Sequence, residues 1–251
     1  MTSRKKLYIN ERNLVTIDPV GPAQGTAFEK YKEGKNLFLT GSAGTGKTFI
    51  LLYLALKEVL DKDTPFDKVV IVRSLLPSRD VGFLPGSLEE KSMLYQSAYR
   101  FLVRFLFQMP NEGEFDVLYD KLLAQGTIEF ASTSFLRGLT FDRSIIICDE
   151  CQNFTFQELD TITTRVGQDT KIMYAGDEGQ TDIVNGQKSG YHNFSAIVEE
   201  MKEVEIVEFG IGDIIRSGFA RSYIIAKQNV SQEKYQDIKT QIFKEFLKYK
   251  R

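Results

Sequence analysis

A glycine-rich segment near the start of the chain has the residue types needed to hold a chain of phosphates. Residues 41–48 read G-S-A-G-T-G-K-T, which matches G-x-x-x-x-G-K-[ST] directly after the apolar run Asn36–Thr40. Glycines let backbone N–H groups surround a phosphate, a lysine supplies a cation, and a threonine hydroxyl can bind Mg²⁺. A structural turn could match by chance, but the flanking pattern favours a P-loop for ATP and Mg²⁺. The predicted binding residues are Gly41, Ser42, Ala43, Gly44, Thr45, Gly46, Lys47 and Thr48.

Two carboxylates follow a second apolar run. Asp149 and Glu150 come directly after Ile145–Cys148, where a Walker B pair belongs. The aspartate would hold Mg²⁺ with Thr48, and the glutamate would polarise the attacking water. A solvated cap at the strand end is the alternative, but it leaves the preceding apolar residues unexplained. The pair therefore favours hydrolysis, with Lys47 and Glu150 as catalytic residues.

The same carboxylates lie between two cysteines, Cys148 and Cys151. This C-x-x-C spacing is found in redox pairs and in metal sites. A Walker B pair explains Asp149 and Glu150 better than a redox pair does. A metal site would lack ligands because His192 is the only histidine.

Polar residues also follow a third apolar run. After Lys171–Ala175, residues 176–182 read G-D-E-G-Q-T-D. We expect them at the same sheet edge as the phosphates. An amide there can hydrogen-bond a phosphate oxygen or the lytic water and lose that bond when phosphate leaves. Gln180 is therefore the candidate γ-phosphate sensor, although G-D-x-G in isolation is simply a turn.

Short apolar strands separated by helical stretches must position these residues. Runs such as V-V-I-V within Lys68–Arg73 are typical of strands buried on both faces of a parallel sheet. Residues 48–60 have helical spacing. The pattern predicts an α/β fold with a mostly parallel, doubly wound sheet flanked by helices, and a ligand beyond the strands' carboxyl ends. The expected strands are 36–40, 68–73, 144–148, 171–175 and 205–209.

The length of 251 residues suits one domain. We expect an N-terminal extension over 1–20, an ATPase core over 21–228 with a helical insertion at about 77–130, and an amphipathic helix over 229–251. Packing on its own core is the simpler role for that helix; a membrane surface or a partner is the alternative.

The composition bounds the class of protein. A hydrophobic fraction of 42% and a charged fraction of 26% are those of an ordinary soluble chain. The net charge of -2 provides no bulk basic field, so nucleic-acid binding would need a local patch. No apolar run approaches the ~20 residues of a membrane helix, and the N-terminus lacks a signal peptide's apolar stretch. We expect a cytoplasmic protein with no membrane partner.

Together, the motifs resemble those of a known family. They are the P-loop, V-G-F-L-P-G at 81–86 with L-E-E-K at 88–91, D-E-C-Q-N at 149–153, and G-D-x-x-Q-T-D at 176–182. The chain resembles the PhoH-like ATPases of bacteria and their phages, which look like the first RecA-like lobe of superfamily 1 helicases. The resemblance covers about residues 20–225 and implies a single RecA-like P-loop domain. It also implies that the protein comes from a bacterium or a phage-infected bacterial cell.

The resemblance also implies roles for individual residues. Gln24 is expected to read the adenine edge, and Arg73 to face nucleic acid or phosphate. Arg137 and Arg216 match the family's Arg-Gly and D-x-x-R elements. In this family a neighbouring subunit of a ring, usually hexameric, completes the site, so either arginine is expected to act in trans. A local ion pair is the alternative for each.

The sequence departs from the family at two positions. Ser217-Gly218 stands where the family usually has His-Pro, and Cys151 replaces an alanine in the D-E-A-Q-N element.

Three functions remain open at this point. The first is an ATPase, possibly RNA helicase-like, that contacts single-stranded RNA through Arg73 and the aromatic, basic stretch Tyr95–Phe107. Core packing with a solvated edge is the alternative for that stretch. The second is a P-loop kinase for a small acceptor, with the helical insertion as a lid. The third is a nucleotide-gated binding protein with little turnover. The D-E-x-Q and G-D-x-x-Q elements favour water as the acceptor.

Overall fold

The computed structural model describes residues 9–74, 88–109, 111–133, 136, 138–180 and 189–230. Within these residues, six strands form one sheet in the order β3-β2-β4-β5-β1-β6, and every neighbouring pair is parallel. The predicted α/β class with a parallel sheet is confirmed. The strands are β1 (Asn36–Gly41), β2 (Lys68–Arg73), β3 (Ile128–Ser132), β4 (Ser144–Cys148), β5 (Lys171–Ala175) and β6 (Val204–Phe209).

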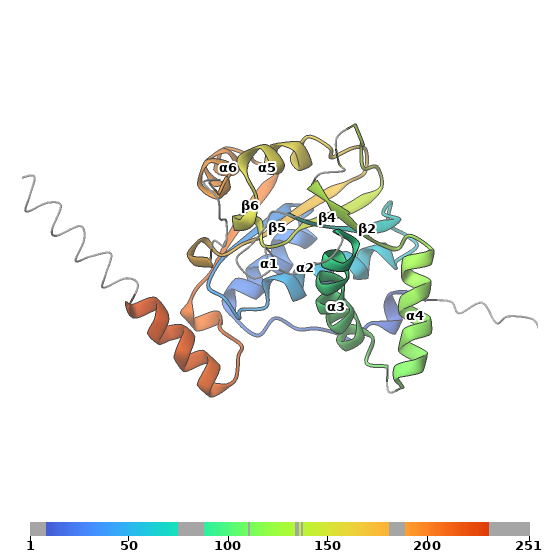
Figure 1. The fold of residues 1–251 in the computed structure, drawn as a ribbon, viewed down its shortest axis with the longest axis horizontal. Coiled ribbons are helices and arrows are strands. Elements are labelled where there is room, and N and C mark those ends of the chain that lie inside the picture. The colour runs from blue at the N-terminus through green and yellow to red at the C-terminus, as the bar shows by residue number, and fades with distance from the viewer. Residues whose placement is uncertain are drawn as a thin grey trace, which may run out of the picture.

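Helices cover both faces of this sheet (Figure 1). Those that pack on one face are α1 (Pro22–Lys32), α2 (Lys47–Val59), α3 (Leu88–Phe107) and α4 (Glu112–Ala124); those on the other are α5 (Phe156–Thr163) and α6 (Tyr191–Glu199). Short 3-10 turns are η1 (Glu11–Asn13), η3 (Cys151–Asn153), η4 (Glu178–Gln180) and η5 (Ile211–Asp213). None of the helices described is long and apolar enough to cross a lipid bilayer.

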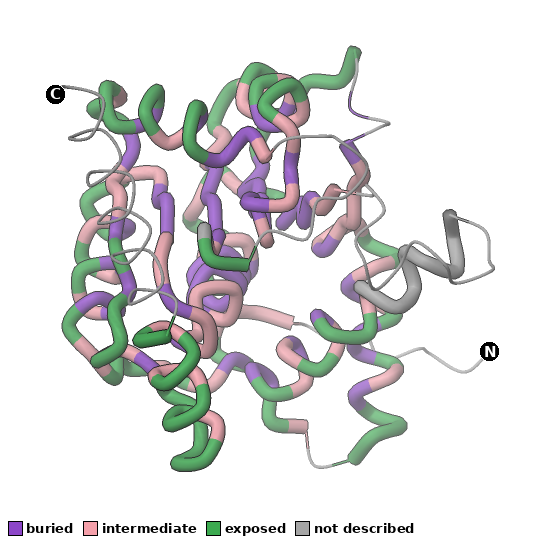
Figure 2. The backbone as a smooth tube through the Cα atoms, turned by 60° about the vertical axis from the view of Figure 1, so that its left-hand side comes forward, coloured by how far each residue is buried: buried purple, intermediate pink, exposed green. Residues whose placement is uncertain are grey.

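Two hydrophobic cores lie on the two sides of the sheet. On β1, Leu37 and Leu39 pack into the core beneath α1 to α4, whereas Phe38 packs beneath α5 and α6. Successive side chains of a strand point to opposite faces, so a strand covered on both sides must be apolar throughout. Figure 2 shows the buried residues gathered in the interior of the molecule, with the exposed residues on its outside.

The strand β3 is not among those that the sequence predicts. It lies at the end of the region expected as an insertion, and it pairs with β2 at the edge of the sheet. The helices α3 and α4 therefore form the connection between two neighbouring parallel strands. The 81–86 motif of this connection lies outside the described residues.

The start of the described chain packs on the core, and its end is helical. Near the start, the Val15 N–H donates to the Leu106 carbonyl of α3 at 2.8 Å. Near the end, residues 218–230 are helical, so this helix begins within the range predicted as core. The rest of the predicted C-terminal helix, from residue 231, lies outside the described residues.

Candidate nucleotide-binding site

The P-loop joins the end of β1 to the start of α2 and depends on its glycines. Gly41, Gly44 and Gly46 have φ values of 104°, 72° and 85°, a left-handed region that favours glycine. A Cβ on Gly41 would lie 2.2 Å from the Phe209 carbonyl oxygen of β6, so only glycine fits there. The loop leads into the N-terminus of α2, which is a favourable place for an anion.

Lys47 lies over this loop. Its ammonium donates to the carbonyl oxygens of Gly41 at 2.8 Å and Ser42 at 2.7 Å. Burial lowers the Lys47 pKa, while the nearby carboxylates of Asp177 and Glu150 oppose that shift. The cation is therefore held at the position where a phosphate chain would enter.

Thr48 and Asp149 bring the P-loop and the end of β4 together. The Thr48 hydroxyl donates to Asp149 Oδ1 at 2.7 Å, and Asp149 is only 4% exposed. These two oxygen groups fit Mg²⁺, which keeps most of its waters and needs few protein ligands. The described residues contain no group of three or more His, Cys, Asp or Glu that would form a fuller metal cage.

Glu150 sits at the turn after β4 with a left-handed φ of 55°. Gln152 donates to Glu150 Oε2 at 2.6 Å, and the Arg73 guanidinium lies 3.9 Å from Oε1 and 4.0 Å from Asp149 Oδ2. Burial and the neighbouring Asp149 carboxylate raise the Glu150 pKa. A carboxylate with a raised pKa is a better proton acceptor, which suits a general base.

The buried amide of Gln152 ties the acidic pair to the loop after β5. Its Oε1 accepts from the Asp177 backbone N–H at 2.9 Å, and its Nε2 lies 3.3 Å from the Gln180 carbonyl oxygen. The Gln180 side chain donates to Asp177 Oδ2 at 2.7 Å. The predicted phosphate sensor is thus connected to Glu150 through Gln152, the glutamine of the D-E-x-Q element.

These groups line a common cavity of about 520 Å³. It brings together most of the residues predicted from sequence, and it adds an aromatic wall from α3. Its lining includes Ala43, Gly44, Thr45, Gly46, Lys47, Thr48, Arg73, Tyr99, Phe101, Asp149, Glu150, Asp177, Gln180 and Arg216. Arg137 lies outside the described residues.

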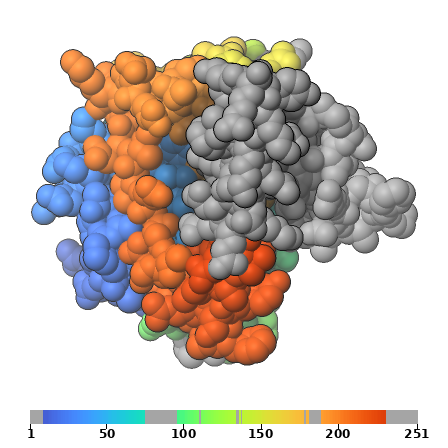
Figure 3. Space-filling model, turned by 90° about the vertical axis from the view of Figure 1, so that its left-hand side faces the viewer, coloured from blue at the N-terminus to red at the C-terminus, as the bar shows by residue number. Residues whose placement is uncertain are grey.

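Arg216 lies at the P-loop of its own chain. A Cβ on Gly44 would be 2.8 Å from Arg216 Cγ, and the Ile215 N–H donates to the Gly44 carbonyl at 3.1 Å. The segment after β6 therefore packs directly on the phosphate-binding loop. Figure 3 shows the last part of the described chain, coloured orange to red, as a continuous surface on one side of the molecule.

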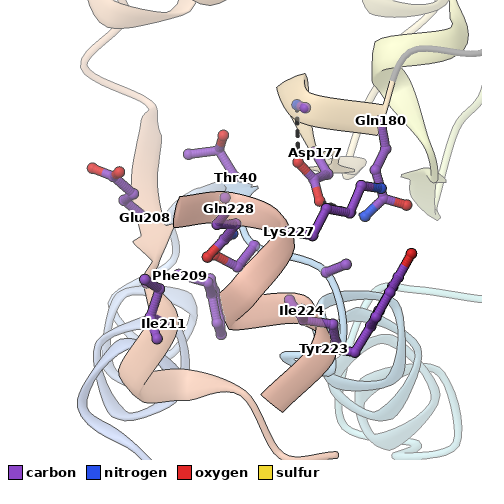
Figure 4. A pocket seen from close by; sticks show the side chains of 15 residues that line it. Thr40, Asp177, Gln180, Glu208, Phe209, Ile211, Tyr223, Ile224, Lys227 and Gln228 are labelled. Carbon is purple, nitrogen blue, oxygen red and sulfur yellow. Dashed lines mark hydrogen bonds between the residues drawn. The ribbon is translucent and has the colours of Figure 1, made fainter. Parts of the chain in front are cut away.

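A second cavity, of about 760 Å³, lies between the P-loop and the helical residues 218–230 (Figure 4). Gln228 of that helix donates to the Ser42 hydroxyl at 2.6 Å, and Lys227 points toward Gln180. Asp177 and Gln180 line both cavities, so the predicted sensor lies between the phosphate side and the last described helix.

Gln24 lies beneath the P-loop and is 3% exposed. Its Oε1 accepts from the Val20 N–H at 2.9 Å, and its Nε2 donates to the Thr45 carbonyl at 3.2 Å. Both polar atoms of the amide have protein partners in this arrangement. The adenine-reading role of Gln24 stays a prediction.

Cys148 and Cys151 are free and fully buried, and burial raises the pKa of both thiols. Buried thiols of this kind are chemically inert packing groups.

The family that the sequence matches agrees with the geometry of this phosphate-binding site. The sequence pattern described as PhoH-like protein matches residues 16–228, which is most of the chain. The chain belongs to the PhoH-like protein family. Protein PhoH of Escherichia coli (strain K12) is 35% identical over 192 residues, covering 75% of this chain and 52% of that protein. Protein PhoH2 of Bacillus subtilis (strain 168) is 33% identical over 184 residues, covering 72% and 41%. This PhoH-like chain thus spans about half the length of these curated relatives.

Solved helicase structures are similar to this chain at greater distance. The Hef helicase domain of Pyrococcus furiosus aligns with a TM-score of 0.43 at 14% identity, covering 76% of this chain and 39% of its own. The Pif1 helicase of Candida albicans aligns with a TM-score of 0.38 at 16% identity, covering 77% and 40%. Family membership and the site geometry together support a P-loop NTPase.

Proposed function

We propose that the chain binds ATP with Mg²⁺ and hydrolyses it. The observation that carries this proposal is the 2.7 Å contact between Thr48 and Asp149, which joins the P-loop to the acidic pair in one cavity. A phosphate-binding loop alone would serve many enzymes, whereas the adjacent Glu150 supplies a base for water.

Each residue has a distinct role in this proposal. Lys47 neutralises charge on the β- and γ-phosphates, and Glu150 orients a water and accepts its proton as the oxygen attacks the γ-phosphorus. The bond to the β–γ bridging oxygen then breaks, and ADP and phosphate form. Mg²⁺, held by Thr48 and Asp149, would neutralise developing charge on the phosphates. Gln180 senses the γ-phosphate.

Two substitutions test the core of the proposal. We expect Lys47→Ala to lose both ATP binding and turnover, and Glu150→Gln to bind ATP but lose turnover by about 10²–10⁴-fold. Nucleotide affinity and release of γ-labelled phosphate would be measured for both variants and the wild type. Label on a small metabolite would instead identify a kinase, and binding without release would identify a nucleotide-gated binding protein.

We further propose that single-stranded RNA contacts α3. This rests on Phe101 and Phe105, which are 71% and 53% exposed and lie one helical turn apart, so that both rings are on the same side of α3 and can offer stacking faces. The neighbouring cations of α3 are partly neutralised, since Arg100 pairs with Asp116 and Arg104 pairs with Glu112. Stacking would therefore contribute more than phosphate contacts.

Assembly into a homo-oligomeric ring, usually a hexamer in the family, also stays a prediction. So does location in the cytoplasm of a bacterium or a phage-infected cell. Native mass spectrometry with ATP tests the assembly directly, because a monomer under turnover conditions would exclude any arginine acting in trans.

A further inference from the structure

Tyr99 is the one aromatic hydroxyl of α3, among the described side chains, that reaches the acidic pair. It is 2% exposed, and its hydroxyl donates to Asp149 Oδ2 at 2.5 Å. Its ring lies edge-on to Phe130 of β3, with centroids 5.5 Å apart, and the Arg73 guanidinium lies 6.0 Å from its centroid. Packing on these sides fixes the position of the hydroxyl.

The two oxygens of Asp149 consequently have different surroundings. Oδ1 accepts from Thr48, whereas Oδ2 accepts from Tyr99 and faces Arg73 at 4.0 Å. A carboxylate that is free to rotate could present either oxygen or both. Here Oδ2 is already engaged on the α3 side, so Oδ1 is the oxygen turned toward the P-loop threonine.

We propose that Tyr99 is a positioning residue, which holds the Asp149 carboxylate in the orientation that binds Mg²⁺ together with Thr48. The inference rests on the proposed function. Partners of this kind, which bond a metal ligand without touching the metal, fix the ligand's orientation and strengthen metal binding. Tyr99 also makes the metal site depend on the position of α3.

The test compares two tyrosines that differ in whether the hydroxyl has a partner. Tyr119 of α4 is also buried, at 4% exposure, but its hydroxyl has no hydrogen-bond partner within the described part of the chain. Affinity for ADP would be measured by calorimetry on the full chain, with Mg²⁺ and with a chelator, for Tyr99→Phe and the control Tyr119→Phe. Tyr99→Met is a second variant without the hydroxyl, in case the first does not fold.

We expect Tyr99→Phe to weaken ADP binding about tenfold with Mg²⁺, the lower end for such partners, and to leave Mg²⁺-free binding unchanged. Tyr119→Phe should match the wild type in both conditions. In an Asp149→Asn background, Tyr99→Phe should cause no further loss, because its effect passes through that carboxylate.

Two results would overturn the inference. The first is unchanged Mg²⁺-dependent affinity in Tyr99→Phe, and the second is an equal loss with and without Mg²⁺, which would indicate general loosening of the cavity. Failure of the proposed function would look different, because the wild-type chain would then bind ADP no better than Lys47→Ala.

Discussion

Glu150, the base in the proposed hydrolysis, has a raised pKa, and this gives a prediction for the pH dependence of turnover. Burial and Asp149 raise its pKa, so the carboxyl stays protonated to a higher pH than an ordinary glutamic acid. A general base works only when deprotonated. ATP turnover should therefore fall as the pH is lowered through this raised pKa, which a profile of kcat/KM against pH would reveal.

Gln152 allows the assignment of this pH dependence to Glu150 to be checked. Its hydrogen bond to Glu150 Oε2 favours the charged carboxylate and so lowers the pKa. Gln152→Met should move the acid limb of the profile to higher pH, whereas Gln157→Met, at an exposed position of α5, should leave it in place. An acid limb that Gln152→Met does not move would assign the titration to another group.

Gly41 gives a prediction about the stability of the folded chain. Gly41→Ala would place a Cβ 2.2 Å from the Phe209 oxygen at a φ of 104°. We expect a loss of about 1–3 kcal/mol or more in the free energy of unfolding, measured by urea denaturation. In Gly25→Ala, the added Cβ meets nothing within 4 Å, and helix propensity should stabilise α1 by about 0.5–1 kcal/mol. Equal stability of the two variants would contradict the backbone strain expected in Gly41→Ala.

The contacts of two residues of the site could not be predicted from their own sequence context. Tyr99 lies in a stretch that reads Q-S-A-Y-R, and no local pattern connects it with Asp149, which follows 50 residues later. Gln152 lies inside a recognised motif, but its bonds to the loop after β5 depend on how β4 and β5 pair. Residues expected to touch phosphate are easier to identify from motif spacing than the residues that orient those phosphate-binding side chains.

The helix α3 is the element on which the nucleic-acid proposal depends. If bases stack on its exposed face, Phe101→Ala should weaken binding of a single-stranded RNA oligonucleotide by about 1–3 kcal/mol. Binding should depend only weakly on salt, since few phosphates are neutralised. Fluorescence anisotropy at several salt concentrations would measure both quantities.

Val117 provides the control for α3. It is an exposed apolar residue on α4, at 63% exposure, and Val117→Ala should leave RNA affinity unchanged. A steep salt dependence together with unchanged binding in Phe101→Ala would place the RNA contact elsewhere on the molecule.

The accuracy of the sequence prediction differed among elements for a physical reason. Central strands buried on both faces, such as β2 and β4, form continuous apolar runs that are visible in sequence. The edge strand β3 is half-buried and carries Glu129, so its pattern is weak. The contact between residues 218–230 and the P-loop is equally hidden, because it joins segments far apart in the chain.

At the scale of the whole molecule, the topology explains why the motifs converge. β4 and β5 are neighbours in the parallel sheet, and β1 follows β5, so the three loops at their carboxyl ends meet. The P-loop, the acidic pair and the Gln180 loop need no further domain to come together. A single domain of this kind can lack an arginine that stabilises the transition state. The sequence resemblance assigns that arginine to a neighbouring subunit.

The position of Arg216 argues that this arginine is supplied in cis, and subunit mixing can test it. Arg216 lines the cavity of its own chain, so Arg216→Ala should lower turnover by about 10³-fold. Mixing Arg216→Ala with Lys47→Ala should then restore nothing, because no subunit would hold both residues.

Recovery of activity in that mixture would show that Arg216 acts in trans. Native mass spectrometry must first confirm that the variants form mixed assemblies, since unmixed subunits cannot complement each other. The same mixture with Arg137→Ala tests the other arginine. If only the Arg137→Ala mixture regains turnover, a neighbouring copy contributes Arg137 while Arg216 stays with its own P-loop.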